Sequence, residues 1–125
     1  MGTQIEFLNT RPNLNVRNIE ASAAFYRDLL GFTVEAQMGD PPSFALLRRG
    51  GAEIALNRDA QPQAAGCYIY VRGVEALHNQ LQAAGANITY PLTTEPWGLR
   101  NFVVQDPDGH GIAIGEWTGD EPRSH

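Results

Sequence analysis

Three histidines come first, because imidazole is the commonest metal ligand and a frequent general base. His78 lies beside Leu77 in a predicted helix, His110 follows an Asp-Pro-Asp-Gly turn, and His125 is the last residue, which we expect to be disordered. A zinc site needs three or four donors at about 2.0–2.3 Å. These histidines lack the spacing of a zinc motif, so we predict that they do not form a metal site. We expect His78 at the surface or the core boundary and His110 in solvent.

Nucleophilic chemistry has few candidates. Cys67 is the single cysteine, so an internal disulfide cannot form, which favours a reducing compartment. The sequence has no nucleophile elbow, Walker loop, Cys-x-x-Cys pair or dinucleotide-binding fingerprint. Gly50 and Gly51 fit a hairpin turn. Cys67 falls on the helix-facing side of a predicted strand, where we expect it to pack as a small buried hydrophobe.

The acidic residues indicate structure more than catalysis. Residues 106–109, Asp-Pro-Asp-Gly, fit a turn. Glu53 and Arg48 are expected to pair across a hairpin, a contact worth less than about 1 kcal/mol when exposed. Glu35 and Glu95 are the two acids that we place near the rim of the predicted binding site described below. A metal-free general base there stays open as an alternative.

Length and charge exclude several classes of function. The chain has 125 residues, 42% of them hydrophobic, and a net charge of −5, which fits one globular domain. Because lysine and arginine do not cluster, we expect no nucleic-acid partner. No apolar run approaches the roughly 20 residues of a membrane span, and residues 1–8 do not resemble a signal peptide. We therefore predict a cytoplasmic protein with no membrane partner.

A weak internal repeat predicts the architecture. Residues 14–21 are similar to residues 69–76, and in each copy an alternating strand runs into a helix. The helices are expected at 19–30, with Asn18 as the N-cap, and at 74–84. Further strands are expected at 32–37, 43–48, 52–57, 87–90, 99–105 and 111–117. The predicted class is α+β, with two βαβββ modules in a single domain: module one at about 10–58, a linker at 59–65, module two at about 66–118, and a flexible tail at 119–125.

Three segments carry a family resemblance. They are Asn-Leu-Asn-Val-Arg-Asn-Ile at 13–19, Ala-Phe-Tyr-Arg-Asp-Leu-Leu-Gly-Phe at 24–32, and Trp-Gly-Leu-Arg at 97–100 leading into Asp-Pro-Asp-Gly-His at 106–110. With them the chain resembles the vicinal-oxygen-chelate superfamily, which includes glyoxalase I, extradiol dioxygenases, and fosfomycin- and bleomycin-resistance proteins. Residues 12–14 and 95–98 look closest to bleomycin-resistance proteins. The resemblance implies a mixed sheet curved into a cup with the helices outside, but one fold hosts several chemistries.

Strand alternation predicts which side chains line this cup. The apolar set that includes Leu14, Ile54 and Ile112 suits the helix-covered face, so the opposite set lines the cup. Short hairpins then place Phe44 and Leu46 beside Ala55, and Arg100 and Phe102 beside Ala113. The predicted ligand-binding residues are Asn15, Phe44, Leu46, Asn57, Tyr68, Tyr70, Trp97, Arg100, Phe102 and Trp117. Aromatic rings with a few polar groups suit a planar or partly apolar small molecule, although Phe44, Leu46 and Phe102 could instead fill a closed barrel.

The resemblance also bears on metal binding. Metal-dependent relatives hold a divalent ion through His or Glu at four positions, two in each module. The resemblance places these positions at Arg11, Ala55, Gly66 and Ala113, and none of these side chains can ligate a cation. It therefore implies a protein with no metal, no other cofactor and no assigned catalytic residue.

The favoured hypothesis is metal-free binding of a small, aromatic organic molecule or antibiotic, as in bleomycin-resistance proteins. The resemblance implies a homodimer with a ligand crevice in the cup or at the subunit interface, and residues 3–10 could cross to the partner. Arg100 in the cup would suit an aromatic or anionic ligand better than cationic bleomycin. One alternative is a metal-dependent enzyme of the glyoxalase or dioxygenase type. Another is a regulatory or partner-binding module.

Overall fold

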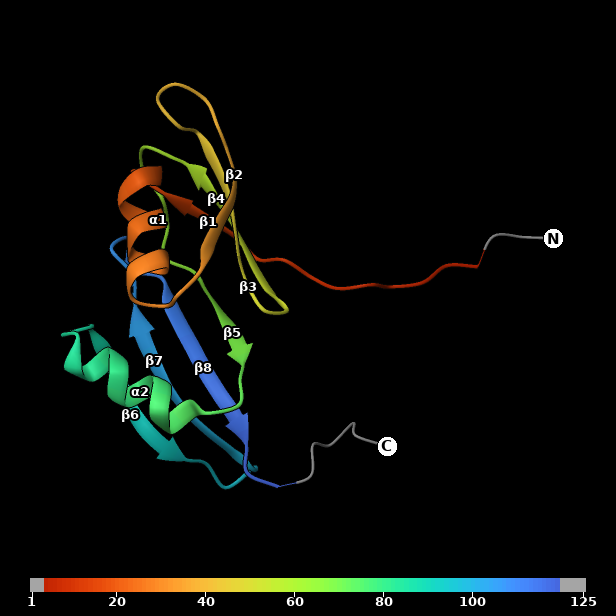
Figure 1. Ribbon diagram of the computed structural model, residues 1–125, viewed down its shortest axis with the longest axis vertical. Helices are drawn as coiled ribbons and strands as arrows, with labels where there is room; N and C mark the ends of the chain where they lie inside the picture. The colour runs from red at the N-terminus through yellow and green to blue at the C-terminus, as the bar shows by residue number, and fades with distance from the viewer. Residues whose placement is uncertain (1–3, 120–125) are drawn as a thin grey trace.

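The computed structural model describes residues 4–119 and contains the βαβββ unit twice (Figure 1). The first unit consists of β1 (Asn13–Val16), α1 (Ile19–Asp28), β2 (Thr33–Met38), β3 (Phe44–Arg49) and β4 (Ala52–Arg58). The second consists of β5 (Gly66–Tyr70), α2 (Val74–Ala83), β6 (Ile88–Thr94), β7 (Leu99–Gln105) and β8 (Gly111–Trp117). The predicted α+β class with two βαβββ modules is confirmed. His125 and, except for Gly119, the predicted tail lie outside the described residues.

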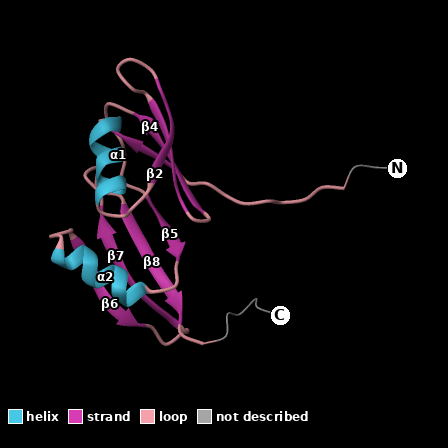
Figure 2. Ribbon diagram, viewed as in Figure 1, coloured by secondary structure: helices cyan, strands magenta, loops and turns pink. Residues whose placement is uncertain are grey.

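Each module forms one mixed sheet of four strands. The strand orders are β1-β4-β3-β2 and β5-β8-β7-β6. In both sheets the first strand pairs in parallel with the last, and the other pairs are antiparallel. Figure 2 shows both helices along one side of the molecule, so each sheet has one helix-covered face. We call the other face of each sheet its open face. No helix among residues 4–119 is long and apolar enough to cross a membrane.

The two helices begin in different ways. The Asn18 side chain accepts a hydrogen bond from the backbone N–H of Ala21 at 2.8 Å and caps α1 as predicted. At α2 the capping group comes from β8, where the Glu116 carboxylate accepts from the backbone N–H groups of Val74 and Gly73 at 3.0 and 2.9 Å. These bonds favour the charged carboxylate and lower the pKa of Glu116. The cap therefore fixes the start of α2 against the strand that carries Trp117.

The core lies between the helices and the sheets. Leu14, Val16, Ile54, Leu56, Ile112 and Ile114 are all buried, as the alternation predicts. The largest buried side chains are Tyr26 from α1 and Phe102 from β7. Burying an apolar side chain of this size stabilises the fold by roughly 1.5–3 kcal/mol, so helix packing fixes which face of each sheet stays open.

The register of β7 differs from the prediction. Phe102 pairs with Ile114 and Arg100 pairs with Glu116, which places both on the helix-covered face. The predicted placement of Arg100 and Phe102 in the cup is therefore wrong. In the β3–β4 hairpin Arg49 pairs with Ala52 and two residues form the turn, whereas Gln105 pairs with Gly111 and five residues, 106–110, form the second turn. The two turns differ in length by three residues, which is an odd number. Because side chains alternate between the two faces of a strand, an odd shift in register moves every side chain of β7 to the opposite face from the one predicted.

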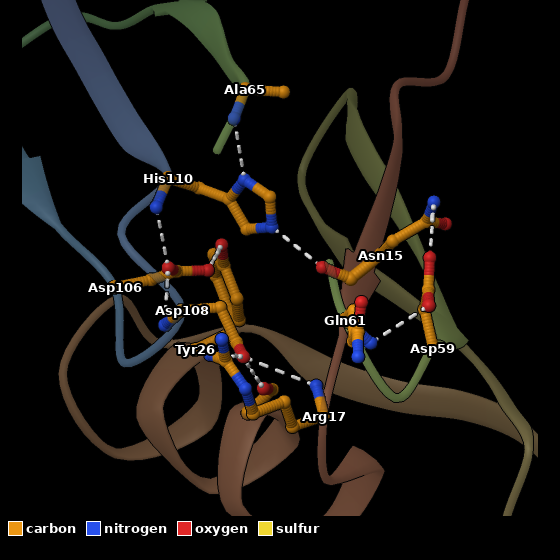
Figure 3. Close-up of polar contacts among 10 residues, drawn as sticks. Asn15, Arg17, Tyr26, Asp59, Gln61, Ala65, Asp106, Asp108 and His110 are labelled. Carbon is orange, nitrogen blue, oxygen red and sulfur yellow. Dashed lines mark hydrogen bonds and ion pairs between the residues drawn. The ribbon is translucent and has the colours of Figure 1, made fainter. Parts of the chain in front are cut away.

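The second turn joins the two modules (Figure 3). Asp106 Oδ2 accepts a hydrogen bond from the Tyr26 hydroxyl at 2.8 Å, and Oδ1 accepts from the backbone N–H groups of Asp108 and His110 at 2.9 and 2.8 Å. Asp108 in turn accepts from Arg17 and from the Ser22 hydroxyl, both in module one. The aspartates thus shape the turn as predicted and also bind module one.

His110 is buried in this junction, so the expectation that it lies in solvent is wrong. Its Nδ1 accepts from the backbone N–H of Ala65 at 2.9 Å, and its Nε2 lies 2.7 Å from the carbonyl oxygen of Asn15. A neutral ring with its proton on Nε2 satisfies both contacts. The imidazole therefore links the linker, β1 and the second turn.

Replacing Tyr26 with Phe tests this junction. Tyr26 is fully buried, and its burial, together with the Asp106 carboxylate, raises the pKa of its hydroxyl. Tyr26→Phe leaves Asp106 Oδ2 without its buried donor, so we expect it to lower the free energy of unfolding by about 1–3 kcal/mol. Tyr90→Phe is the matched control, because Tyr90 is exposed and its hydroxyl bonds to Glu95. If urea denaturation shows that both variants lose equal stability, the Tyr26–Asp106 hydrogen bond does not stabilise the module junction.

Candidate ligand-binding site

The open faces of the two sheets carry different side chains. In module one the register groups Asn13, Asn15, Phe44, Leu46, Ala55 and Asn57. In module two it groups Tyr68, Tyr70, Asn101, Val103, Ala113 and Trp117. Amide and aliphatic groups therefore dominate the first open face, and aromatic rings dominate the second.

Three aromatic rings, from Tyr68, Tyr70 and Trp117, form what we call the aromatic cluster. The Tyr68 and Tyr70 centroids lie 4.9 Å apart, and the rings of Tyr70 and Trp117 stack with centroids 5.9 Å apart and planes 8° apart. Their common face follows from alternation along β5 and β8, which pair Tyr70 with Gly115. Tyr68 is 37% exposed and Tyr70 is 53% exposed. The cluster thus offers accessible aromatic surface to a flat molecule.

Gly115 makes room for this arrangement. A Cβ atom at Gly115 would lie 2.0 Å from the Tyr68 hydroxyl oxygen and 2.8 Å from its ring carbon Cζ. Both distances are shorter than van der Waals contact, so the Tyr68 ring can lie across β8 only because position 115 has no side chain. This residue therefore positions the cluster without touching solvent itself.

Asn101 supplies a polar group beneath the cluster. Its Nδ2 donates to the Tyr68 hydroxyl oxygen at 2.9 Å, and the residue is 8% exposed. Because Tyr68 accepts this bond, its own O–H is left to donate elsewhere. Asn101 Oδ1 is buried without a hydrogen-bond partner among the described residues. Sequence reasoning missed Asn101 because it placed the alternate side chains of β7 on the wrong faces of the sheet.

The predicted residues of module one lie on its open face. Phe44 pairs with Asn57 and Leu46 pairs with Ala55, as expected. Phe44 and Leu46 are half-buried, and the amides make only long contacts, such as Asn57 Nδ2 to Asn13 Oδ1 at 3.4 Å. Asn15 has a similar contact with Asp59 at 3.4 Å. These groups therefore remain accessible for binding.

The other predicted site residues lie elsewhere. Arg100 pairs with Glu75 of α2 at 3.1 Å and donates to the Thr94 hydroxyl at 2.7 Å. Phe102 is buried, with its ring 5.2 Å from that of His78, so His78 lies at the core boundary as expected. Trp97 is 62% exposed in the turn between β6 and β7. Only Trp97 of these three predicted site residues stays available to a ligand.

The structure also shows the partners of the acidic residues Glu35, Glu53 and Glu95. Arg48 donates to both Glu53 and Glu35 on the open face of module one, which confirms the cross-strand pair. Glu95 accepts from the Tyr90 hydroxyl at 2.9 Å. Both glutamates considered as a general base thus already hold a hydrogen-bonding partner.

Comparison with known proteins identifies the family. Residues 7–114 match the family model described as the Glyoxalase/Bleomycin resistance protein/Dioxygenase superfamily. The chain belongs to this superfamily. No curated protein sequence matches it.

Several solved structures share the fold at low sequence identity. TioX from Micromonospora sp. ML1 is 22% identical over 89% of this chain and 99% of its own, with a TM-score of 0.80. A bleomycin resistance determinant encoded on the transposon Tn5 is 20% identical over 88% and 98%, with a TM-score of 0.77. A lactoylglutathione lyase from Agrobacterium tumefaciens is 16% identical over 90% and 96%, with a TM-score of 0.78. At these identities the likeness shows the fold alone.

The four positions that the family resemblance assigns to metal ligands do not carry side chains that suit a cation. Arg11 is itself cationic, and Ala55 is buried with no donor atom. A Cβ atom at Gly66 would lie 2.3 Å from the carbonyl oxygen of Gly111, so a ligating side chain has no room there. Ala113 lacks a donor as well. Residues 4–119 also contain no group of three His, Cys, Asp or Glu that could hold a metal.

Cys67 lies at the side of the site, on the helix-facing side of β5. It is half-buried, not fully buried as expected. Burial and the nearby Asp106 carboxylate raise the pKa of its thiol from 9.0 to about 11. The thiolate is the reacting species, so a higher pKa lowers its population at neutral pH.

We therefore expect slow alkylation of Cys67. At pH 8 its reaction with iodoacetamide should be about tenfold slower than that of a free cysteine peptide, because a smaller thiolate fraction outweighs a stronger nucleophile. The rate should keep rising above pH 9.0 toward about 11. Mass spectrometry across this pH range measures it, and a rate that levels off near pH 9.0 would contradict the raised pKa.

Proposed function

We propose that this chain binds a small, planar aromatic molecule on the aromatic cluster, without a metal and without converting it. The observation that carries the proposal is that Tyr68 and Tyr70 are exposed on an open sheet face, with the half-buried ring of Trp117 stacked against Tyr70. Soluble proteins seldom leave a group of large rings in contact with water unless the surface binds something. Stacking on such rings contributes about 0.5–1.5 kcal/mol beyond the burial of their area.

The charges favour a neutral ligand. Arg100, which would have suited an anion, is held by Glu75 on the helix-covered face. On the open face of module one, Arg48 is paired with Glu35 and Glu53, so this cation is not available to an anionic ligand. The Tyr68 hydroxyl supplies an oriented hydrogen bond. A neutral aromatic compound with one acceptor atom matches these groups best, and some antibiotics have this chemistry.

The residues also favour binding over catalysis. The four positions that the resemblance assigns to metal ligands carry no side chain that could ligate a metal, and Glu35 and Glu95 each already have a hydrogen-bonding partner. The fold is similar to that of a bleomycin resistance determinant, so we propose that this chain sequesters a compound. We place the protein in the cytoplasm, where a lone free cysteine stays reduced.

We further propose that the working unit is a homodimer. β1 and β5 are edge strands of their sheets, so the open face of either module can continue onto a second copy. A crevice between the aromatic cluster of one copy and the amide groups of the other would enclose a ligand on two sides. Such burial is typical of small-molecule sites.

A fluorescence titration tests the proposed function. Trp97→Phe leaves Trp117 as the single tryptophan, so its emission reports on the cluster. We expect 9-fluorenone, a planar ketone, to quench this emission with saturable binding in the micromolar range. Fluorene, which lacks the acceptor, should bind more weakly. No saturable binding by either compound up to its solubility limit, or by other planar heteroaromatics, would overturn the proposal.

A further inference from the structure

Asn101 holds an unpaired hydrogen-bond acceptor beneath the aromatic cluster. Its Oδ1 atom is the one buried side-chain nitrogen or oxygen of residues 4–119 that has no hydrogen-bonding partner there. The residue as a whole is 8% exposed. Native proteins leave few buried polar atoms unpaired, and each of them needs a physical explanation. A ligand that supplies the donor would explain an unpaired acceptor below a binding surface.

The neighbours of Asn101 in the sheet do not supply this donor. β7 pairs Asn101 with Gly115 of β8 on one side and with Thr93 of β6 on the other. Gly115 has no side chain, and the Thr93 hydroxyl donates to the carbonyl oxygen of Pro91 at 2.7 Å. The Nδ2 atom of Asn101 donates to the Tyr68 hydroxyl oxygen at 2.9 Å. In the free protein the amide therefore uses its donor side and leaves its acceptor unpaired.

Two complementary hydrogen-bonding groups thus lie close together on the open face of module two. The Tyr68 oxygen accepts from Asn101, so the Tyr68 O–H is left to donate. The Oδ1 atom of Asn101 can only accept. A ligand that satisfies both groups must carry an acceptor and a donor side by side. A plain ketone such as 9-fluorenone satisfies the Tyr68 hydroxyl alone.

The edge of a lactam has this pair of groups. Its C=O and N–H are neighbours on the ring and point in nearly the same direction. An ortho-hydroxy ketone also has a carbonyl and a donor, but its hydroxyl donates to its own carbonyl oxygen. A carboxylate has acceptors only, and its charge would face the Asn101 oxygen. The unpaired groups therefore favour a neutral, planar lactam over these other aromatic compounds.

We propose that the aromatic cluster selects planar lactams through Tyr68 and Asn101. The ligand stacks on the cluster, its carbonyl oxygen accepts from the Tyr68 O–H, and its N–H donates to Asn101 Oδ1. Because Oδ1 is already shielded from water in the free protein, this bond costs the protein little further desolvation. The inference rests on the proposed function, because it names the class of molecule that the same cluster binds.

Tyr68 controls access to the acceptor. Its ring lies across β8 where Gly115 leaves room for it, and its hydroxyl contacts the Asn101 amide. The residue is 37% exposed, so the ring has solvent beside it into which it can turn. A small rotation of the ring uncovers Asn101 and keeps the Tyr68 hydroxyl beside the ligand.

Three ligands test the selection on the unchanged protein. Phenanthridinone is a planar lactam, N-methylphenanthridinone keeps the carbonyl but lacks the N–H, and 9-fluorenone is a planar ketone. In isothermal titration calorimetry we expect phenanthridinone to bind about fivefold more tightly than either of the others, which is the contribution of one ordinary hydrogen bond. Equal affinity for phenanthridinone and its N-methyl derivative would overturn the proposal.

Asn101→Leu separates the hydrogen bond from the bulk of the added methyl group. Leucine has nearly the shape of asparagine but no polar side-chain atoms. In this variant phenanthridinone should lose its advantage over 9-fluorenone. Asn87→Leu is the matched control, because Asn87 is exposed and bonds to Gln105 away from the cluster, so the preference should persist. A lactam preference that survives Asn101→Leu would overturn the proposal.

The stability of the free protein distinguishes a ligand contact from a structural role. Asn101→Leu replaces an unpaired buried acceptor with an apolar group, a change that is nearly neutral or stabilising. We therefore expect the midpoint of urea denaturation to stay the same or to rise. A marked fall in the midpoint would show that Asn101 serves the fold, and would overturn the proposal.

The ligand series also separates this inference from the proposed function. If none of the three compounds binds, the proposed function fails and the lactam preference fails with it. If 9-fluorenone and N-methylphenanthridinone bind but the N–H of phenanthridinone adds no affinity, the proposed function stands and the lactam preference alone is wrong.

Discussion

Replacing Asp106 with Ala should lower the free energy of unfolding by about 3 kcal/mol or more. The carboxylate is 5% exposed and accepts three hydrogen bonds, from the Tyr26 hydroxyl and from the backbone N–H groups of Asp108 and His110. Its loss leaves three donors at the module junction, and each buried unsatisfied group costs about 1–3 kcal/mol. Urea denaturation followed by circular dichroism measures the change.

Asp28→Ala is the control for this loss. Asp28 is exposed and, among residues 4–119, its carboxylate pairs with its neighbour Arg27, so its removal should cost far less stability than Asp106→Ala. A double variant adds a second check. Tyr26→Phe introduced into Asp106→Ala should have almost no further effect, because residues in one network are not additive. Full additivity of the two losses would contradict the network.

The second large effect concerns the ligand site. Trp117→Ala should weaken binding of 9-fluorenone at least about tenfold, since it removes the ring that stacks on Tyr70 at 5.9 Å. Loss of stacking costs about 0.5–1.5 kcal/mol beyond the lost contact area, and 1.4 kcal/mol corresponds to tenfold in affinity. Isothermal titration calorimetry measures the change without requiring a tryptophan signal.

Arg100→Gln is the informative control for Trp117→Ala. The sequence pattern places Arg100 in the cup, but the structure pairs it with Glu75 on the helix-covered face. We therefore expect binding within twofold of the parent chain. A loss comparable to that of Trp117→Ala would show that the ligand reaches the other face of β7, and would contradict the assigned site.

The architecture was predictable because it is repeated. The two copies of the strand-to-helix segment, at 14–21 and 69–76, carry the same alternation, and each helix has an apolar stripe that must be covered. The open face of module one was also predictable, because a two-residue turn in the β3–β4 hairpin keeps the register simple. Phe44 and Leu46 lie beside Asn57 and Ala55 for that reason.

The open face of module two was only partly predictable. Tyr68, Tyr70 and Trp117 follow from alternation in β5 and β8, which pair directly. Which face each side chain of β7 occupies depends on the length of the turn 106–110. The composition of this turn does not determine how many of its residues pair between β7 and β8. The misplacement of Arg100 and Phe102 hid Asn101, the residue between them, which bonds to Tyr68.

The module junction was beyond sequence reasoning for a different reason. Asp106 and His110 lie in a run rich in turn residues, which is typical of an exposed loop. They are buried because α1 and β1 of the other module cover them, and that contact joins residues far apart in the chain, such as Tyr26 and Asp106. Local patterns carry no information about such a contact.

The central claim is that the open face binds an aromatic molecule without a metal. The most direct test is calorimetric titration of 9-fluorenone into protein treated with EDTA and dialysed, compared with the same protein supplied with zinc, nickel or manganese. We predict the same affinity and stoichiometry in every case, and no bound metal by elemental analysis. Binding that appears only after a metal is added, with that metal retained in stoichiometric amount, would contradict the claim.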